Sequence, residues 1–150
     1  AKRTFGGVGI FGMRFPFVGD GNTSYNSMIS GDNLFLIQSE TIVKLAENKQ
    51  GAVFVGRCAD YVLRERNDVV SVFITANEAD RVKRLCNRRG CTEAEARDMM
   101  KKVDKQRSAY YDYYASREWG VASSYDICIN SSLLGIEGTV DAIINIVRRK

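Results

Sequence analysis

Residues 52–63 read AVFVGRCADYVL, and this stretch decides the fold. The apolar, β-branched segment 52–55 predicts a strand that is buried on both faces of a sheet. Gly56 allows a sharp turn, and Arg57 then places a permanent planar cation at the carboxyl end of that strand. Ligands bind at this edge in open parallel α/β sheets, and a guanidinium fork matches phosphate oxygens. The alternative is structural, with Arg57 and Asp60 pairing at the start of a helix.

Composition narrows the class of protein. A chain of 150 residues with 45% apolar residues predicts a single domain with a buried core. The net charge of +4 indicates an anionic ligand more than a surface that coats nucleic acid. No apolar run is long enough to span a bilayer and no secretory leader is present, so we expect a cytoplasmic protein without a membrane partner.

Two residue types limit the chemistry. The four cysteines form no CxxC pair, which predicts reduced thiols and no metal site built on them. Histidine is absent, and this excludes Ser-His-Asp catalysis, Cys-His catalysis and every histidine-based metal site within the chain. Enzymes that mainly position and neutralise phosphates work without histidine.

The distribution of glycine divides the chain into two parts. Residues 1–32 hold seven of the 13 glycines and the only proline, which predicts an irregular or flap segment. Regular patterns begin at residue 33 and alternate between strand and helix, which predicts a parallel sheet flanked by helices. The expected strands are 52–55, 69–76 and 125–130, and the expected helices are 33–49, 58–65, 78–89, 93–117 and 140–149.

Local signals mark several helix ends. We expect Asp32 and Asn77 to cap the helices that follow them, because short polar side chains accept hydrogen bonds from free N–H groups. Gly90 is expected to end a helix. Thr92 with Glu95 three residues later is the pattern of a capping box.

Charged and aromatic side chains crowd the two helices 78–89 and 93–117. Most of the basic residues are explained as a solvated face with i,i+4 ion pairs. Asp104 and Arg107 share a helix face at i,i+3, so they can meet one ligand such as a sugar hydroxyl beside a phosphate, and an intrahelical ion pair is the competing account. The tyrosine-rich segment 110–114 could stack on bases, although tyrosines spread around a helix more commonly build cores and interfaces.

Together these segments resemble the cytidylate kinase-like family of P-loop kinases. The resemblance covers roughly residues 33–148 and implies a three-layer P-loop kinase-like α/β fold, a parallel sheet flanked by helices, incomplete at its N-terminus. Residues 33–150 would then be the C-terminal part of a single kinase-like domain. The segments that carry the resemblance are GRCADYVL (56–63), VSVFITANEADRVKRL (70–85), VDKQRSAYYDYY (103–114) and YDICINSSLLGIEGTVDAI (125–143).

The resemblance implies a transferase. The intact protein would phosphorylate a nucleoside monophosphate, with CMP or dCMP preferred, using ATP and Mg²⁺ whose ligands are expected largely outside these 150 residues. The alternative is a catalytically degenerate domain of the same fold that binds nucleotides or a partner without turnover. An RNA-binding module is a third and less favoured reading, and phosphate-backbone binding of that kind would weaken steeply with salt.

The resemblance also assigns roles to acceptor-binding residues. Arg57 matches the arginine of a Gly-Arg-Asp motif that holds the acceptor nucleotide. Cys58 stands where that motif has its aspartate, so the base-reading carboxylate is absent there and Asp60 is the candidate substitute. Asp104 and Arg107 match an Asp-x-x-Arg motif that contacts the acceptor sugar and phosphate.

The donor side of the expected site is assigned in the same way. The resemblance places the arginines of a short lid in the helix 78–89 and implies that they neutralise charge on the transferring phosphoryl group. Ser131 and Ser132 follow the last strand, where the family passes near the adenine of ATP. The lid arginines fall among Arg81, Arg84, Arg88 and Arg89, and the last three are the expected catalytic residues.

The phosphate loop is the family feature that this sequence lacks. Such kinases begin with a strand and a Gly-rich loop that ends in Gly-Lys-Ser/Thr or a close relative. The glycines of residues 6–12 have no Lys-Ser/Thr after them and indicate a flexible connection. The missing strand would lie between 52–55 and 69–76, so we expect another segment to fill that place and pair the two exposed edges.

Overall fold

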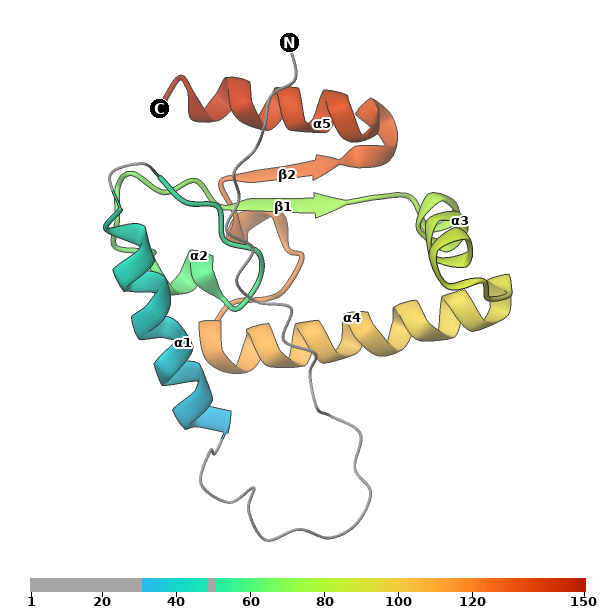
Figure 1. The fold of residues 1–150 in the computed structure, drawn as a ribbon, viewed down its shortest axis with the longest axis horizontal. Helices are drawn as coiled ribbons and strands as arrows, with labels where there is room; N and C mark the ends of the chain where they lie inside the picture. Colours follow the sequence, from blue (N-terminus) through green and yellow to red (C-terminus); the bar gives the residue numbers. More distant parts are fainter. Residues whose placement is uncertain (1–30, 49–50) are drawn as a thin grey trace, which may run out of the picture.

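The structure is a computed structural model that describes residues 31–48 and 51–150 (Figure 1). Residues 1–30 of the predicted flap segment lie outside the described residues, and its last two belong to the first helix. The elements are α1 (Gly31–Ala46), α2 (Ala59–Val62), β1 (Val72–Thr75), α3 (Glu78–Arg89), α4 (Glu93–Ala115), the 3-10 turn η2 (Ala122–Ser124), β2 (Ile127–Asn130) and α5 (Ser131–Val147).

The sheet is small and parallel. β1 pairs with β2 in a register that places Val72 opposite Ile127 and Thr75 opposite Asn130. Both strands point the same way, because α3 and α4 carry the chain from the end of β1 back to the start of β2 (Figure 1). α5 packs along the sheet and α3 packs against α4. The two predicted strands 69–76 and 125–130 and their parallel pairing are therefore confirmed, with shorter bounds.

The predicted strand 52–55 is wrong for the described part of the chain. No ladder forms there, and Val53 and Val55 are 94% and 90% exposed. A strand exists only where a neighbour takes its N–H and C=O groups, and the described residues offer this segment none. β1 likewise has a single neighbour within the described ranges. The insertion of another segment between these two edges stays a prediction.

The ends of α3 and α4 confirm the local signals. α3 spans the predicted residues and ends at Gly90, whose left-handed φ of 65° lets its N–H bond to the carbonyl of Cys86 at 2.8 Å. The capping box of α4 forms in full. The Oγ1 of Thr92 accepts from the N–H of Glu95 at 3.3 Å, and the carboxylate of Glu95 accepts from the N–H of Thr92 at 2.8 Å. Hydrogen bonds to this carboxylate from the N–H and then the hydroxyl of Thr92 lower the pKa of Glu95.

Two predicted caps are wrong. α1 begins at Gly31, so Asp32 lies inside its first turn, where it accepts a hydrogen bond from the hydroxyl of Tyr114 at 3.1 Å. Asn77 makes no side-chain cap, because its Oδ1 accepts instead from the Nδ2 of Asn130 at 3.0 Å. In both cases the side chain that the local pattern assigned to a helix cap forms a hydrogen bond with a residue distant in sequence instead.

Two helices also differ in extent. α2 starts only at Ala59, because the residues before it are left-handed, and it is four residues long. α5 starts at Ser131 rather than at residue 140, since Asn130 caps it through a hydrogen bond from the N–H of Ser132 at 3.0 Å. A kink at Gly135, with φ 68° and ψ −178°, separates its first turn from the remainder.

The core of the described residues is small and divided. One cluster joins Ile42 of α1 with Ala59 and Leu63, and a second joins Cys58 with Tyr111 and Ala115 of α4. Large apolar side chains on α1 and α5 remain exposed, including Leu36, Ile37, Leu133 and Ile136. Such faces mark surfaces that packing normally covers. Among the helices described, none is both long and apolar enough to cross a membrane.

Candidate functional site

The turn between segment 52–55 and α2 has an uncommon backbone. Gly56, Arg57 and Cys58 are consecutive left-handed residues, with φ of 72°, 60° and 53°. A non-glycine residue in this region costs about 1 kcal/mol, so Arg57 and Cys58 store strain side by side. Strain of this kind persists only where surrounding contacts hold it, and it is concentrated at functional sites.

Cys58 anchors the turn in the core. Its side chain is 2% exposed and lies in the cluster with Tyr111 and Ala115. Burial, and secondly the nearby carboxylate of Asp60, raises the pKa of Cys58 to about 11. The thiol is therefore protonated at neutral pH, and it acts as a packing group instead of an anion or a nucleophile. No carboxylate stands at this position to read a base.

The two functional candidates of the turn both reach α4. The carboxylate of Asp60 accepts a hydrogen bond from the hydroxyl of Tyr111 at 2.6 Å. The hydroxyl of Tyr110 donates to Oε1 of Gln38 at 3.4 Å, and the cation of Arg57 lies near it. Burial raises the pKa of Tyr110, and the cation of Arg57 opposes this rise. Sequence reasoning linked Arg57 and Asp60 only to each other and missed both tyrosines as partners.

Asp104 has a stronger partner than the one its spacing indicates. Nη2 of Arg81 donates to both of its carboxylate oxygens, at 2.9 and 2.7 Å. Arg107, the predicted i,i+3 partner, has its Nη1 4.0 Å from Oδ1 and its side chain 62% exposed. The carboxylate thus joins α3 to α4, while the guanidinium of Arg107 is turned largely to solvent.

The serines predicted for the ATP side lie at the carboxyl edge of the sheet. The hydroxyl of Ser131 donates to the carbonyl of Thr75 at 2.9 Å, which joins the end of β2 to the end of β1. The hydroxyl of Ser132 accepts from the N–H of Asn77 at 2.9 Å. Asn130 completes the network through its bond to Asn77. Sequence reasoning missed the pairing of these asparagines, although each directly follows or ends a predicted strand.

The expected lid arginines lie along α3. Arg84, Arg88 and Arg89 are exposed and form no ion pair within residues 31–48 and 51–150. They are therefore accessible to an anionic ligand, whereas Arg81 is occupied by Asp104.

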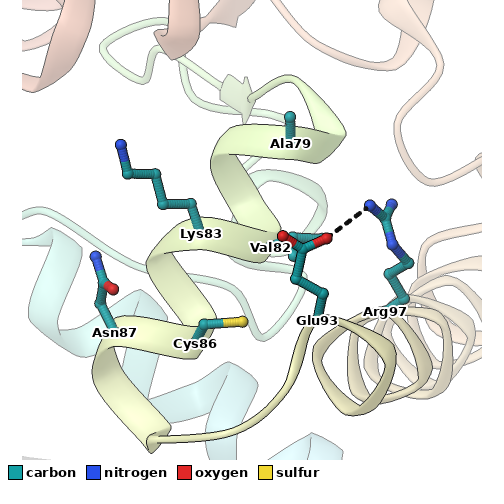
Figure 2. Close-up of a pocket in the computed structure, with 7 residues that line it drawn as sticks. All are labelled: Ala79, Val82, Lys83, Cys86, Asn87, Glu93 and Arg97. Atoms are coloured by element: carbon teal, nitrogen blue, oxygen red, sulfur yellow. Dashed lines mark hydrogen bonds and ion pairs between the residues drawn. The ribbon is translucent and has the colours of Figure 1, made fainter.

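A hollow of about 430 Å³ lies between α3 and the start of α4 (Figure 2). In Figure 2 Glu93 and Arg97, both of α4, point toward each other at its edge, with Nη2 and Oε2 3.4 Å apart. Arg97 also pairs with Glu78. The hollow is lined by none of the predicted site residues, so it is separate from the expected chemistry. Its lining comprises Ala79, Val82, Lys83, Cys86, Asn87, Glu93 and Arg97.

The tyrosine-rich segment is chiefly structural. Tyr111 is 6% exposed, and the ring of Tyr114 stacks on Phe35 of α1 at a centroid distance of 4.2 Å. Tyr110 packs against Tyr114 at 4.9 Å. Tyr113, at 71% exposure, is the one member of the segment that is open to stacking by a base. The structure supports the core interpretation for the other three.

Magnesium has no protein cage among the described residues. Within residues 31–48 and 51–150 no three histidine, cysteine, aspartate or glutamate side chains are grouped so as to hold a metal ion. In kinase sites the ion is bound mainly by substrate phosphates with one or two carboxylates.

Comparison with known proteins identifies the family. The sequence model of the cytidylate kinase-like family matches residues 8–133. The chain belongs to this family. An uncharacterized protein from Eubacterium ventriosum has a similar crystal structure, with 32% identity and a TM-score of 0.76, over 82% of this chain and 69% of that one. No curated protein matches the chain.

Membership of the cytidylate kinase-like family gives the site a nucleotide kinase-like context. The helix-dominated α/β structure with a small parallel sheet is consistent with a P-loop kinase fold. The family match begins at residue 8 and so extends into the segment predicted to be irregular. The structure brings Arg57 and Asp60 against α4, the same helix that carries Asp104 and Arg107.

Proposed function

We propose that the intact protein transfers the γ-phosphoryl group of ATP to a nucleoside monophosphate, with CMP and dCMP preferred. The observation that carries this proposal is the turn at residues 56–58. Its strained backbone presents Arg57 beside α4, and α4 also carries the Asp104 and Arg107 pair. A guanidinium, a carboxylate and a second guanidinium on adjoining elements suit the phosphate and sugar of one nucleotide.

Each group has a chemical role in this proposal. Arg57 binds the acceptor phosphate bidentately, and Arg107 adds a second cation near it. Asp104 accepts a hydrogen bond from a sugar hydroxyl. Ser131 and Ser132 lie on the adenine side at the carboxyl edge of the sheet. Asp60, held by Tyr111, remains a candidate contact to the acceptor base.

The transfer itself needs little covalent chemistry from the chain. Phosphoryl transfer is accelerated mainly by positioning and by neutralising charge on the equatorial oxygens. The exposed arginines of α3 supply that charge when the α3–α4 hairpin closes over the nucleotides, and closure also excludes water. The absence of histidine is compatible with this chemistry. Mg²⁺ bound with ATP would offset the negative charge of its phosphates. The residues that provide the charge are Arg84, Arg88 and Arg89.

Acceptor specificity is expected to be relaxed. A buried, protonated thiol at Cys58 is a poor hydrogen-bond acceptor compared with a carboxylate. Discrimination that depends on pairing a polar base edge is large, whereas discrimination by shape is modest. CMP, dCMP and UMP should therefore be accepted within roughly a hundredfold in kcat/KM, and purine monophosphates should be rejected by size.

The test is kcat/KM of the full-length protein with ATP and each of CMP, dCMP, UMP, AMP and GMP. A strong preference for AMP or GMP would overturn the cytidylate assignment while leaving a kinase. The absence of turnover with every acceptor would favour the alternative of a degenerate binding domain. That alternative has one observation in its favour, namely that no Gly-Lys-Ser/Thr sequence occurs in the chain.

Asp104→Asn should lower kcat/KM for acceptors roughly tenfold without changing the affinity for ATP. The amide keeps the shape of the side chain and its oxygen still accepts from Arg81, although the ion pair and one of the two hydrogen bonds are lost. Asp98→Asn is the matched control, because Asp98 is an exposed carboxylate on the same helix. Steady-state kinetics with varied acceptor at saturating ATP measures the effect. Equal acceptor kinetics in the two variants would remove Asp104 from the site.

A further inference from the structure

Two adjacent tyrosines of α4 lie against the acceptor turn, defined here as residues 56–60. The hydroxyl of Tyr111 donates to Oδ2 of Asp60 at 2.6 Å. The hydroxyl of Tyr110, which donates to Oε1 of Gln38 at 3.4 Å, lies near the cation of Arg57. A helix directs neighbouring side chains about 100° apart, so one dipeptide reaches both ends of the turn. The sequence motif and its support therefore come from elements about fifty positions apart.

Tyr111 is itself fixed in place. It is 6% exposed, it packs in the cluster that contains Cys58, and its ring stacks on Tyr125 at a centroid distance of 5.9 Å. Burial, and then the hydrogen bond to Asp60, raises the pKa of Tyr111. The hydroxyl is therefore always protonated at neutral pH and is a constant donor to the carboxylate.

The acceptor turn needs such support. Its left-handed residues Arg57 and Cys58 each favour an ordinary right-handed or extended backbone by about 1 kcal/mol. The thiol of Cys58 holds the middle of the turn from inside the core. The hydroxyl of Tyr111 holds Asp60 on one side of it, and the hydroxyl of Tyr110 lies near Arg57 on the other.

The same helix also carries the pair expected at the acceptor sugar. Arg107 and Tyr111 are four positions apart in α4, so they lie one above the other on one face. Asp104 lies a further turn toward the N-terminus on this face. A single rigid helix therefore sets the separation between the acceptor turn and the Asp104–Arg107 pair.

We propose that Tyr110 and Tyr111 are positioning residues of the acceptor site. They hold the acceptor turn in its left-handed form and keep Arg57 at a fixed separation from Asp104 and Arg107. The acceptor assignment rests on the proposed function, whereas the hold on the turn does not depend on it. Neither tyrosine needs to touch the nucleotide.

The kinetic test uses isosteric variants of the full-length protein. Tyr111→Phe removes a single hydroxyl and should raise KM for CMP roughly tenfold, because a hydrogen bond to a charged group is lost. KM for ATP should stay unchanged. A variant that was merely destabilised would contain less active protein, which lowers kcat and leaves both KM values as they are. Tyr110→Phe should act in the same direction. Tyr113→Phe is the matched control, since its ring is 71% exposed, and should leave both KM values unaltered.

A double-mutant comparison shows whether the tyrosine acts through Arg57. In an Arg57→Ala background, Tyr111→Phe should have almost no further effect on KM for CMP, because the group that it positions is already gone. A full additive effect in that background would overturn the proposal that Tyr111 acts through Arg57, and would indicate that it acts through Asp60 or touches the nucleotide itself.

A readout without catalysis separates this proposal from the proposed function. The amides of Ala59, Val62 and Leu63 bond within the turn and α2, and their hydrogen exchange should quicken roughly tenfold in Tyr111→Phe but not in Tyr113→Phe. Unchanged exchange would overturn the hold on the turn, whatever the activity. Faster exchange in a protein that binds no monophosphate would support the role of Tyr111 in fixing the turn. The same result would overturn the proposed function together with the acceptor assignment.

Discussion

Arg57→Ala should weaken binding of nucleoside monophosphates by about 3 kcal/mol, roughly a hundredfold in Kd, because a charge-assisted bidentate contact is lost from a closed site. Arg57→Lys should restore little of this affinity, since an ammonium lacks the planar fork that matches a phosphate. Isothermal calorimetry of the full-length protein with CMP measures both effects.

The backbone of Arg57 allows a sharper version of the same experiment. Arg57 has a φ of 60°, which glycine adopts without strain. Arg57→Gly should therefore leave the thermal midpoint unchanged or slightly raised while it removes CMP binding as completely as alanine does. Arg66→Ala is the control, because Arg66 pairs with Asp68 on the surface. If the alanine, lysine and glycine variants all bind CMP like the wild type, Arg57 has no part in acceptor binding.

The chain of 150 residues should show no phosphoryl transfer by itself. The chain contains no Gly-Lys-Ser/Thr loop to hold the β and γ phosphates of ATP. The segment 52–55 and the outer edge of β1 are both unpaired within the described residues, which agrees with a strand supplied from elsewhere. We propose that the full-length protein contributes both the strand and the loop.

A coupled assay with ATP, Mg²⁺ and CMP tests this expectation. The 150-residue chain should release no ADP above background, while the full-length protein should turn over under the same conditions. Robust turnover by the 150-residue chain would mean that the ATP phosphates are held by residues within it, and would contradict the assignment of the missing loop. Inactivity of both proteins would favour the degenerate binding domain.

Features that depend on a few neighbouring residues were predictable from the sequence. The bounds of α3, its end at Gly90 and the capping box of Thr92 and Glu95 all rest on hydrogen bonds that span three or four positions. The strands β1 and β2 were predictable as well, because each is a short apolar run with a polar residue after it. Their alternation with helices was enough to indicate parallel pairing.

The sequence proposes the residues of the candidate site, but it does not predict their contacts. Arg57, Asp60 and Asp104 are recognisable from their types and from the family resemblance. Their partners are not, because Tyr111 lies 51 positions from Asp60 and Arg81 lies 23 positions from Asp104. Helical spacing pointed to Arg107 as the partner of Asp104, yet a guanidinium from the packed neighbouring helix reaches the carboxylate more closely.

Only the tertiary structure decided those features that depend on contacts between residues distant in sequence. The apolar run 52–55 has every local property of a strand, but a strand also needs a second chain segment to complete its hydrogen bonds. Asn77 has a side chain suited to a helix cap, but its Oδ1 accepts a hydrogen bond from Asn130 at the end of the adjacent strand instead. Local sequence determines which conformations of a segment have a low free energy, and long-range hydrogen bonds and burial select among them. At Arg57 these long-range contacts stabilise a left-handed backbone that is locally unfavourable.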